Sequence, residues 1–477
     1  MLRVKFTRRE AEAGLPVLVP WRQDDALPPK AAPAGFTAAA DTMLDLPGET
    51  RRVWLGLGRA PRQLAWERAG ASAALRLKDV THLAVAAGES SPMEAAWLAA
   101  GLALGAWHFD RHRGAPPARL VRATFRVANP RAAEAAWAQV SPGVEACLFA
   151  RDLVSEPANH LTTRHFAQAL EGLSVHGIHV DILGRKRLSR AGMGALLAVG
   201  AGSDSPPRLA VLRWRGSIAA PPIAFIGKGL VFDTGGISIK PAKGMEAMRA
   251  DMAGAAACAG AMLALARRHS PAPAVAVLAL AENATGAGSY RPSDILRTAS
   301  GRTVEVVDTD AEGRLVLADA LHYAIAAHAP RAMIDLATLT GAVVSALGAH
   351  RAGLFGTDAA LMAQLASVGE AVGEHLWPLP IGAQHRADLA SDIADLRQCV
   401  PTGKGEGWAG RFTPDASHAA AFLREFVGDT PWAHLDIAGV DTQEAAHKLG
   451  PAGASGFGVR LLDRLVAQHF EDEDGHT

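Results

Sequence analysis

The chain has 477 residues, of which 49% are hydrophobic and 20% charged, a composition that is typical of a folded globular protein and excludes wholesale disorder. Its 48 basic and 48 acidic residues give a net charge of zero, which argues against a general polyanion-binding protein. Three scattered cysteines, Cys147, Cys258 and Cys399, exclude a disulfide framework and a C-x-x-C zinc ribbon, so we expect a reducing, cytosolic compartment.

The N-terminal residues 1–10 are basic, but no apolar stretch follows them, so we expect no secretory signal. The longest apolar runs, 95–107 and 272–281, are shorter than the ~18 residues that a membrane-spanning helix needs. We therefore expect a cytoplasmic protein without a membrane partner.

The first part of the chain alternates strand-like and helical segments. Residues 53–57 and 82–86 are typical of strands, and residues 93–107 are typical of a helix. Pro130 and Pro142 bracket a helical, Ala-rich connecting segment, and a second helix is predicted over residues 144–155. This alternation predicts a smaller N-terminal α/β domain over residues 1–140, with the boundary placed to within about ten residues.

The remainder, residues 141–477, alternates apolar strands with helices. Continuous apolar strands separated by helices indicate a sheet that is covered on both faces. We therefore predict a larger C-terminal catalytic domain with a central, mostly parallel sheet flanked by helices. The predicted strands are 208–214, 223–226, 274–280, 303–307 and 332–336, and the predicted helices are 250–267, 315–328 and one from about residue 341.

Charge is unevenly distributed between the two parts. Residues 1–140 contain 19 Lys+Arg and 13 Asp+Glu, a net charge of +6, so the remainder carries −6. This excess indicates either a solvated Arg-rich surface or a weak patch for anions such as nucleic acid. No nucleic-acid-binding motif accompanies it, so we expect no nucleic-acid partner.

Three segments of the second part concentrate acids, lysines and glycines beside apolar strands: residues 226–241, 248–254 and 307–315. Ligands of open α/β sheets bind beyond the carboxyl ends of the strands, so Asp233, Asp310 and Glu312 are expected to converge there. Carboxylates crowded in one cleft repel each other, and a divalent cation removes that penalty. Their oxygen atoms are suited to Mg²⁺, Mn²⁺ or Zn²⁺.

Other interpretations of these segments are weaker. No Ser or Thr follows Lys228 as a phosphate loop requires, and Gly235-Gly236 lacks dinucleotide-loop spacing. A calcium loop from Asp308 to Asp319 has the right order of acids and glycine, but a strand precedes it and no second loop exists. Any one of the acids alone would more often cap a helix or face solvent, whereas three such segments together favour a metal site.

The motifs resemble those of the leucyl aminopeptidases, the two-metal cytosolic family. The similarity extends to residues 151–159, 282–283 with 290–294, 335–341 and 434–439, and it covers about residues 150 to 460. It implies a homohexameric aminopeptidase acting on peptides. The motifs that carry it are Gly227-Lys228-Gly229, Phe232-Asp233-Thr234-Gly235-Gly236, Ile237-Ser238-Ile239-Lys240-Pro241, Ala250-Asp251-Met252 and Asp308-Thr309-Asp310-Ala311-Glu312-Gly313-Arg314-Leu315.

The resemblance implies two metal sites that share Asp233 and Glu312. Lys228 and Asp251 complete one site, and Asp310 completes the other. The ions would be Zn²⁺ or Mn²⁺, with Mg²⁺ or Co²⁺ as alternatives. A lysine ligand must be neutral, so the two dications would have to suppress its usual pKa of ~10.4.

The resemblance also implies the mechanism. Two ions ~3.5–4 Å apart would bridge a water molecule and convert it to hydroxide. The free amino group of the peptide would bind one ion, which explains exopeptidase selectivity. Lys240 would polarise the scissile carbonyl, and Arg314 would hold a bicarbonate ion that acts as general base.

The family's side-chain pocket corresponds to Met248, Thr338, Gly341 and Ala438, which implies a preference for an apolar first residue such as Leu. Asp441 replaces a residue that is usually apolar or aromatic.

Asp308 replaces a residue that is usually Asn, and its carboxylate either alters the metal preference or faces solvent. An alternative function on the same fold is a hexameric DNA-binding regulator, which only the +6 charge of residues 1–140 supports.

Overall fold

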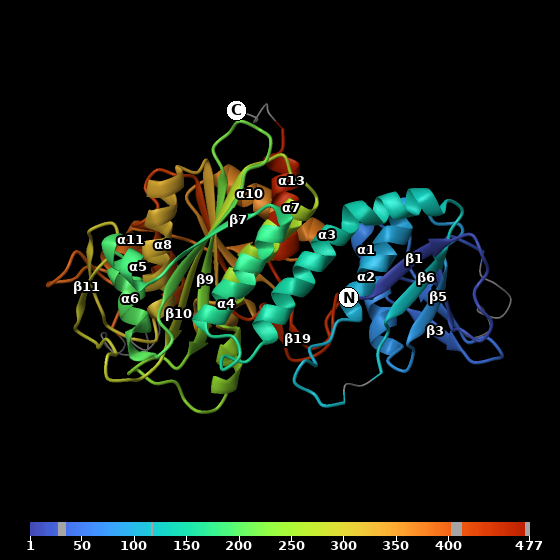
Figure 1. Ribbon diagram of the computed structural model, residues 1–477, viewed down its shortest axis with the longest axis horizontal. Helices are drawn as coiled ribbons and strands as arrows, with labels where there is room; N and C mark the ends of the chain where they lie inside the picture. The colour runs from blue at the N-terminus through green and yellow to red at the C-terminus, as the bar shows by residue number, and fades with distance from the viewer. Residues whose placement is uncertain (27–34, 116–117, 402–412, 473–477) are drawn as a thin grey trace. The chain divides into compact units, whose positions relative to one another are not determined.

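The computed structural model describes residues 1–26, 35–115, 118–401 and 413–472 (Figure 1). The chain forms two compact units: Met1–Leu148 with Gln443–Ser455, and Phe149–Thr442 with Gly456–Thr477. The sequence places a boundary near residue 140, and the structure divides the chain inside a long helix, α3 (Pro130–Ser155).

The prediction that Pro142 separates two helices is wrong. Helix α3 runs from Pro130 to Ser155 with Pro142 inside it. A proline removes one helical hydrogen bond, but Pro142 is buried, as are Val144 and Ala146 after it. Burial of Pro142 and of Ala146, one turn later on the same face, offsets the missing bond.

The first unit is an α/β structure, as predicted. Its sheet has the strand order β1-β6-β5-β2-β4-β3, and every neighbouring pair is parallel except β3 with β4. Helices α1 and α2 pack at backbone contact, because a Cβ atom at Gly101 would lie 1.9 Å from the carbonyl oxygen of Glu67. The elements are β1 (Arg3–Thr7), β2 (Val17–Trp21), β3 (Met43–Leu46), β4 (Arg52–Gly56), α1 (Gln63–Arg76), β5 (His82–Ala86), α2 (Pro92–Gly105) and β6 (Arg122–Arg126).

Basic side chains occupy one row across three strands of this sheet. The register pairs Arg3 of β1 with Arg122 of β6, and Arg122 with His82 of β5. Arg3 and Arg122 are exposed, and His82 is partly buried. Part of the positive charge of residues 1–140 therefore lies on one sheet surface.

The second unit is built on an eight-stranded sheet of order β15-β14-β17-β13-β9-β10-β8-β7. Its four central strands, β17, β13, β9 and β10, are mutually parallel, which confirms the predicted central, mostly parallel sheet. The strands are β7 (His179–Leu183), β8 (Arg208–Trp214), β9 (Ile223–Asp233), β10 (Ala274–Asn283), β13 (Ala332–Ala337), β14 (Ala352–Gly356), β15 (Leu376–Pro378) and β17 (Trp432–Asp436). Two small sheets contain β11 (Ile295–Arg297), β12 (Thr303–Glu305) and β16 (Leu396–Arg397), and β18 (Thr442–Gln443) and β19 (Gly453–Ala454).

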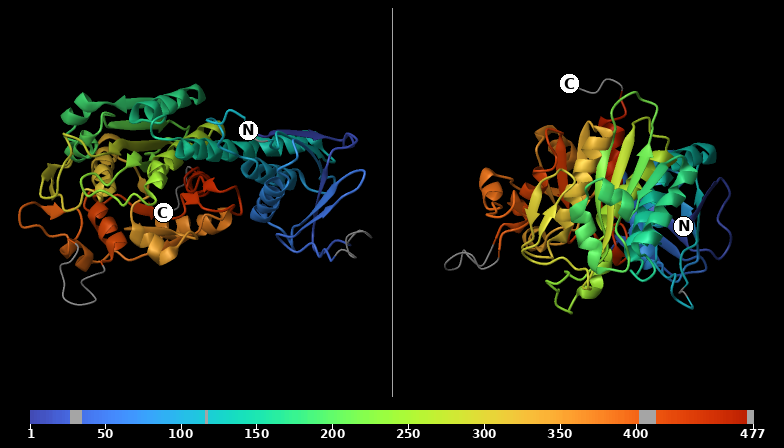
Figure 2. Two further views of the ribbon diagram at one scale, coloured as in Figure 1. Left: turned by 90° about the horizontal axis from the view of Figure 1, so that it is seen from below. Right: turned by 60° about the vertical axis from the view of Figure 1, so that its left-hand side comes forward.

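Helices cover both faces of the large sheet (Figures 1 and 2). Helix α7 packs on β9 and is itself contacted by α13, and α8 packs on β9 and β10 from the other side. Within the described residues, no helix has the length and apolarity needed to cross a bilayer. The helices are α4 (Thr163–Glu171), α5 (Arg185–Arg190), α6 (Gly194–Val199), α7 (Ala253–Arg267), α8 (Glu312–His328), α9 (Gly341–Leu347), α10 (Ala359–Val372), α11 (Ala383–Ala387), α12 (Asp415–Arg424) and α13 (Val459–His469), with the 3-10 turns η2 (Gly172–His176), η3 (Gly200–Gly202) and η4 (Met245–Ala250).

Glycines allow α7 to lie directly on the sheet. A Cβ atom at Gly227 of β9 would lie 2.5 Å from the Cα of Ala255, and one at Gly254 would lie 2.0 Å from the carbonyl oxygen of Leu336. Both distances are far below van der Waals contact. The absence of a side chain at Gly227 and Gly254 therefore permits the close approach of helix and sheet.

The predicted strand 223–226 is the beginning of a longer strand, β9, which continues to Asp233. Lys228 interrupts the apolar pattern of this segment, but it is buried like its neighbours. The strand therefore carries Lys228 and Asp233 from the core to its carboxyl end.

Candidate metal centre

Three carboxylates meet beyond the carboxyl end of β9. Asp233 is the last residue of β9, Asp310 lies in the loop after β12, and Glu312 is the first residue of α8. One oxygen atom from each lies within 4.8 Å of the others. The predicted convergence of these residues is confirmed.

The loop after β9 turns sharply beside these acids. Gly235 and Gly236 have φ angles of 84° and 66°, in the left-handed region that favours glycine. The backbone N–H of Gly235 donates to Oδ1 of Asp233 over 2.8 Å. The turn therefore fixes one oxygen of the Asp233 carboxylate.

Lys228 lies between two carboxylates. Its Nζ is 2.9 Å from Oδ1 of Asp251 and 2.9 Å from Oε1 of Glu312, and it donates to the carbonyl of Thr338 over 2.8 Å. Burial alone lowers the pKa of Lys228, but Asp251 and Glu312 outweigh it and the pKa is raised. Among the protein groups alone, Lys228 is therefore an ammonium ion.

Lys240 approaches the same acids from the loop after β9. Its Nζ lies 2.9 Å from Oδ2 of Asp233 and forms an ion pair with Asp310. Burial lowers the pKa of Lys240, and Asp233 and Glu312 outweigh that effect and raise it. The side chain is 20% exposed, so Lys240 is both charged and accessible.

The charges of the cluster favour additional cations. Burial raises the pKa of both Asp251 and Glu312, and repulsion from Asp233 acts in the same direction. Oδ2 of Asp251 and Oε2 of Glu312 are buried and lack a hydrogen-bond partner among the residues that the structure describes. Oxygen atoms of this kind are ligands for hard divalent cations, so the side chains present fit metal ions.

Two residues without a predicted role hold the cluster in place. Nδ2 of Asn283 donates to Oδ1 of Asp233 over 2.7 Å and to the carbonyl of Thr309 over 3.0 Å. The hydroxyl of Tyr290 donates to the same carbonyl over 2.8 Å. They lie in the family-like segments 282–283 and 290–294, but nothing in their spacing indicates these contacts.

Gln398 is a further support that the sequence does not reveal. Its Nε2 donates to the carbonyls of Asp308 and Ala311 over 2.7 and 3.1 Å, and its Oε1 accepts from the N–H of Val307 over 2.7 Å. Oδ1 of Asp308 accepts from the N–H of Asp310 over 2.9 Å. Asp308 therefore stabilises the turn of the loop that presents Asp310.

Arg314 is 2% exposed and lies one turn or less into α8. Its Nη1 donates to the carbonyl of Gln398 over 3.0 Å, and its Nη2 donates to Oδ1 of Asp415 over 2.9 Å. Burial lowers the pKa of Arg314, and Asp415 outweighs that effect and raises it. Asp415, the first residue of α12, has no predicted role.

The four residues expected in the side-chain pocket come from several elements. Thr338 and Gly341 follow β13, Ala438 follows the neighbouring strand β17, and Met248 lies in η4. Oγ1 of Thr338 also donates to Oδ1 of Asp251 over 2.6 Å, so this residue supports the metal centre as well.

The calcium-loop alternative is wrong. Asp319 lies inside α8 and is fully buried, and its oxygens accept from the N–H groups of Leu196 over 2.9 Å and Ala299 over 2.7 Å. The carboxylate therefore connects α8 to two other backbone segments. It is not the last ligand of a loop that begins at Asp308.

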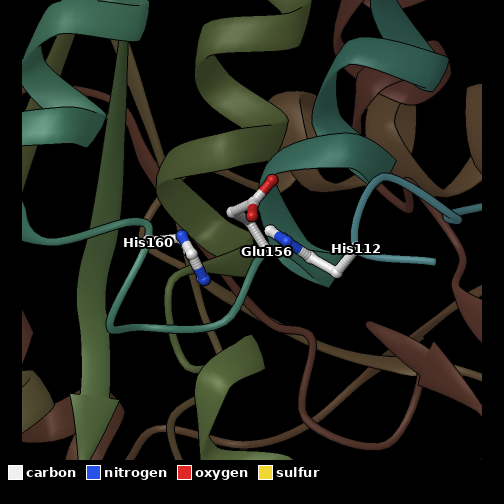
Figure 3. Close-up of side chains that lie close together, drawn as sticks. All are labelled: His112, Glu156 and His160. Atoms are coloured by element: carbon white, nitrogen blue, oxygen red, sulfur yellow. The ribbon is translucent and has the colours of Figure 1, made fainter. Parts of the chain in front are cut away.

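The family-like segment 151–159 forms the end of α3 and the turn after it. Figure 3 shows Glu156 and His160 in this turn of the second unit; His112, also drawn there, belongs to the first unit. None of these residues has a predicted role in the metal centre.

Comparisons with known proteins identify similar chains. Residues 148–463 match the catalytic domain of the cytosol aminopeptidase family. A probable cytosol aminopeptidase of Chelativorans sp. (strain BNC1) is 44% identical over 88% of this chain and 83% of that protein. One from Rhizobium etli (strain CIAT 652) is 42% identical over 96% of this chain and 97% of that protein. The structure of the bottromycin maturation enzyme BotP in complex with Mn is similar, with a TM-score of 0.84 and 32% identity over 94% of this chain and 98% of that one.

Proposed function

Because the chain belongs to the cytosol aminopeptidase family, and is therefore a metal-dependent aminopeptidase, we propose that it releases apolar N-terminal residues such as Leu from peptides. The observation that carries this proposal is the buried carboxylate cluster around Lys228, in which Asp251 and Glu312 each keep one oxygen without a hydrogen bond.

Two divalent ions, Zn²⁺ or Mn²⁺, are the proposed cofactors, and Mg²⁺ or Co²⁺ are alternatives. Two ions in such a site supply Lewis acidity, which lowers the pKa of water and polarises a carbonyl group. The proposed ligands are the side chains that converge beyond β9: Lys228, Asp233, Asp251, Asp310 and Glu312.

Lys240 is the proposed electrostatic catalyst. Its ammonium group is accessible and is oriented by Asp233 and Asp310. A fixed cation of this kind stabilises the negative charge that develops on the oxygen of the scissile carbonyl. Because the group is already oriented, it requires little reorganisation during the reaction.

Met248, Thr338, Gly341 and Ala438 are the proposed contacts for the first side chain of the peptide. Ala438 packs against an apolar cluster that contains Val343 and Phe355, so its surroundings favour an apolar group. Burial raises the pKa of Asp441 to about 6, and a substrate panel that includes Arg and Leu would show whether this carboxylate affects selectivity.

We further propose a cytoplasmic homohexamer. The relatives are named cytosol aminopeptidases, which supports the cytoplasmic location. The homohexamer rests on the resemblance to the leucyl aminopeptidases alone. Size-exclusion chromatography with light scattering would measure the assembly, and a monomeric mass at micromolar concentration would count against it.

The decisive experiment is hydrolysis of leucine p-nitroanilide with Mn²⁺ or Zn²⁺. The wild type should release p-nitroaniline, and Asp233→Asn should not, although it should remain folded. Asp181→Asn is the matched control, because Asp181 pairs with Arg187 near the edge strand β7. A folded wild type without turnover in any divalent metal would contradict the proposal.

A DNA-binding regulator remains the alternative, and the basic row of Arg3, Arg122 and His82 is its structural support. Binding through phosphates would weaken steeply as salt is raised. Fluorescence anisotropy with a labelled duplex from 50 to 200 mM salt would test it, and an absent or salt-independent signal would exclude this alternative.

A further inference from the structure

The buried guanidinium of Arg314 already has an anion beside it. Oδ1 of Asp415 lies 2.9 Å from Nη2, and the other terminal nitrogen is engaged by the carbonyl of Gln398. Arg314 is 2% exposed, whereas the side chain of Asp415 is 37% exposed. The carboxylate therefore reaches inward from the start of α12 to neutralise a buried cation.

An external anion would have to compete with this carboxylate. A tethered group has an effective concentration in the millimolar range or above, so a dissolved anion gains access only if it binds much more strongly than the carboxylate. Bicarbonate carries the same single charge and the same pair of oxygens as a carboxylate, so it has no evident advantage at a guanidinium.

We infer that Asp415 is the anion that Arg314 holds, at the position where the resemblance to the leucyl aminopeptidases implies a bicarbonate ion. This inference rests on the proposed function. The chain supplies this carboxylate itself, so the enzyme does not depend on dissolved bicarbonate. Asp415 thereby acts as a positioning residue for Arg314, and the geometry does not leave both terminal nitrogens of Arg314 open to a small ion.

The first test compares turnover in carbonate-free buffer with turnover in added sodium bicarbonate or sodium formate. The metal-loaded wild type should change less than twofold. Asp415→Ala should lose about 10- to 100-fold in kcat, as is usual for residues that support a metal centre, and should recover with either anion at millimolar concentration. Sodium chloride at equal ionic strength should not restore it.

The second test measures thermal stability and needs no enzymatic activity. It therefore remains valid even if the proposed function is wrong. Removal of Asp415 leaves a buried cation without its partner, which lowers the melting temperature. Formate should raise the melting temperature of Asp415→Ala in a saturable way and should leave that of the wild type unchanged. Asp358→Ala is the control, because Asp358 caps α10 through Leu361 and formate has no guanidinium to bind after its removal.

The outcomes separate the possibilities. The inference would be overturned if bicarbonate activated the wild type as strongly as it activates Asp415→Ala. It would also be overturned if neither bicarbonate nor formate changed the turnover or the melting temperature of Asp415→Ala. If Asp415→Ala does not fold, Asp415→Asn, which keeps the size of the side chain and removes its charge, takes its place. Asp415→Glu should retain anion-independent turnover, because the substitution preserves the carboxylate.

Discussion

One oxygen of Asp251 lies 2.9 Å from Nζ of Lys228, and the other is buried without a hydrogen-bond partner among the described residues. Oδ1 of Asp251 is thus paired with a cation of the protein, and Oδ2 is available to a metal ion. Glu312 repeats the arrangement, with Oε1 on Lys228 and Oε2 unpaired. Lys228 therefore holds two carboxylates in position, and each retains an oxygen for a metal ion.

Replacement of Lys228 by Met should destabilise the metal-free protein. The substitution removes the cation between two buried carboxylates, and loss of one partner from a buried ion pair typically costs ~3–5 kcal/mol. Urea unfolding in the presence of EDTA would measure the loss. Mn²⁺ should restore part of it, because a dication can neutralise the same oxygens.

The matched control for that variant is Lys186→Met, on α5, which is outside the centre. It should change stability by less than about 0.5 kcal/mol, as is usual for surface substitutions. Elemental analysis should also find less metal bound to Lys228→Met than to the wild type. Equal metal content and equal stability would contradict the assigned position of Lys228.

Removal of metal should abolish turnover reversibly. The ligands are held by protein contacts such as that between Asn283 and Asp233, so the fold should survive dialysis against a chelator. Activity should return with Mn²⁺ or Zn²⁺, and the melting temperature should rise with metal concentration, because the ions bind only the folded state. Differential scanning fluorimetry would measure the melting temperature of the metal-free and the metal-loaded protein. A melting temperature that does not change with metal concentration would contradict the proposal that this cluster binds metal ions.

Asn283→Ala should reduce kcat about 10- to 100-fold, because residues that orient metal ligands have effects of this size. The variant loses the hydrogen bonds to Asp233 and to the carbonyl of Thr309. Steady-state kinetics with leucine p-nitroanilide should show a smaller change in KM than in kcat. Asn129→Ala, which removes only a contact with the N–H of Ala132 in α3, should leave both constants unchanged.

The pair formed by His434 and Asp335 should make stability depend on pH. The two side chains are fully buried, and Nδ1 of His434 lies 2.6 Å from Oδ1 of Asp335. Burial lowers the pKa of His434, but Asp335 outweighs it and the pKa is raised above 6.5. Asp436 acts in the same direction and Arg314 opposes it. The stabilisation is therefore complete below about pH 6.5 and is lost as the pH rises through the higher pKa of the folded state.

Urea unfolding of the wild type and Asp335→Asn between pH 6 and 9 would measure this effect. The difference in unfolding free energy should be largest at pH 6 and should shrink as the pH rises, by about 1.4 kcal/mol for each unit of pKa shift. A residual difference should remain at pH 9, because Asp335 also accepts from Nε1 of Trp432. A difference that grows with pH would show that His434 is neutral in the folded protein.

The sequence predicts the parts of the centre that lie in short, distinctive segments. Asp233 ends β9 of the large sheet, whereas Asp310 and Glu312 follow β12 of the small sheet β11-β12-β16. These acids can be recognised beside apolar segments, but the meeting of the two sheets depends on tertiary packing. Strands such as β8 and β10 were predictable because their apolar residues are consecutive, a pattern typical of strands that are buried on both faces of a sheet.

The residues that sequence reasoning missed act across long stretches of chain. Gln398 supports a loop about ninety residues before it, and Asp415 pairs with Arg314 about a hundred residues before it. Neither has a local pattern that indicates such a partner. Pro142 is the opposite case, a local signal that the structure does not follow. Its preference for a helix end is outweighed by burial within α3.

The direct contact of α7 with the sheet also limits how such a chain can diverge. Any side chain at Gly227 or Gly254 would collide with backbone atoms of Ala255 or Leu336 and lift the helix. Asp251 lies just before α7 and would be carried along with it. Natural selection would thus remove substitutions at these two glycines, because they would displace a proposed metal ligand. Neither glycine is itself one of the proposed metal ligands.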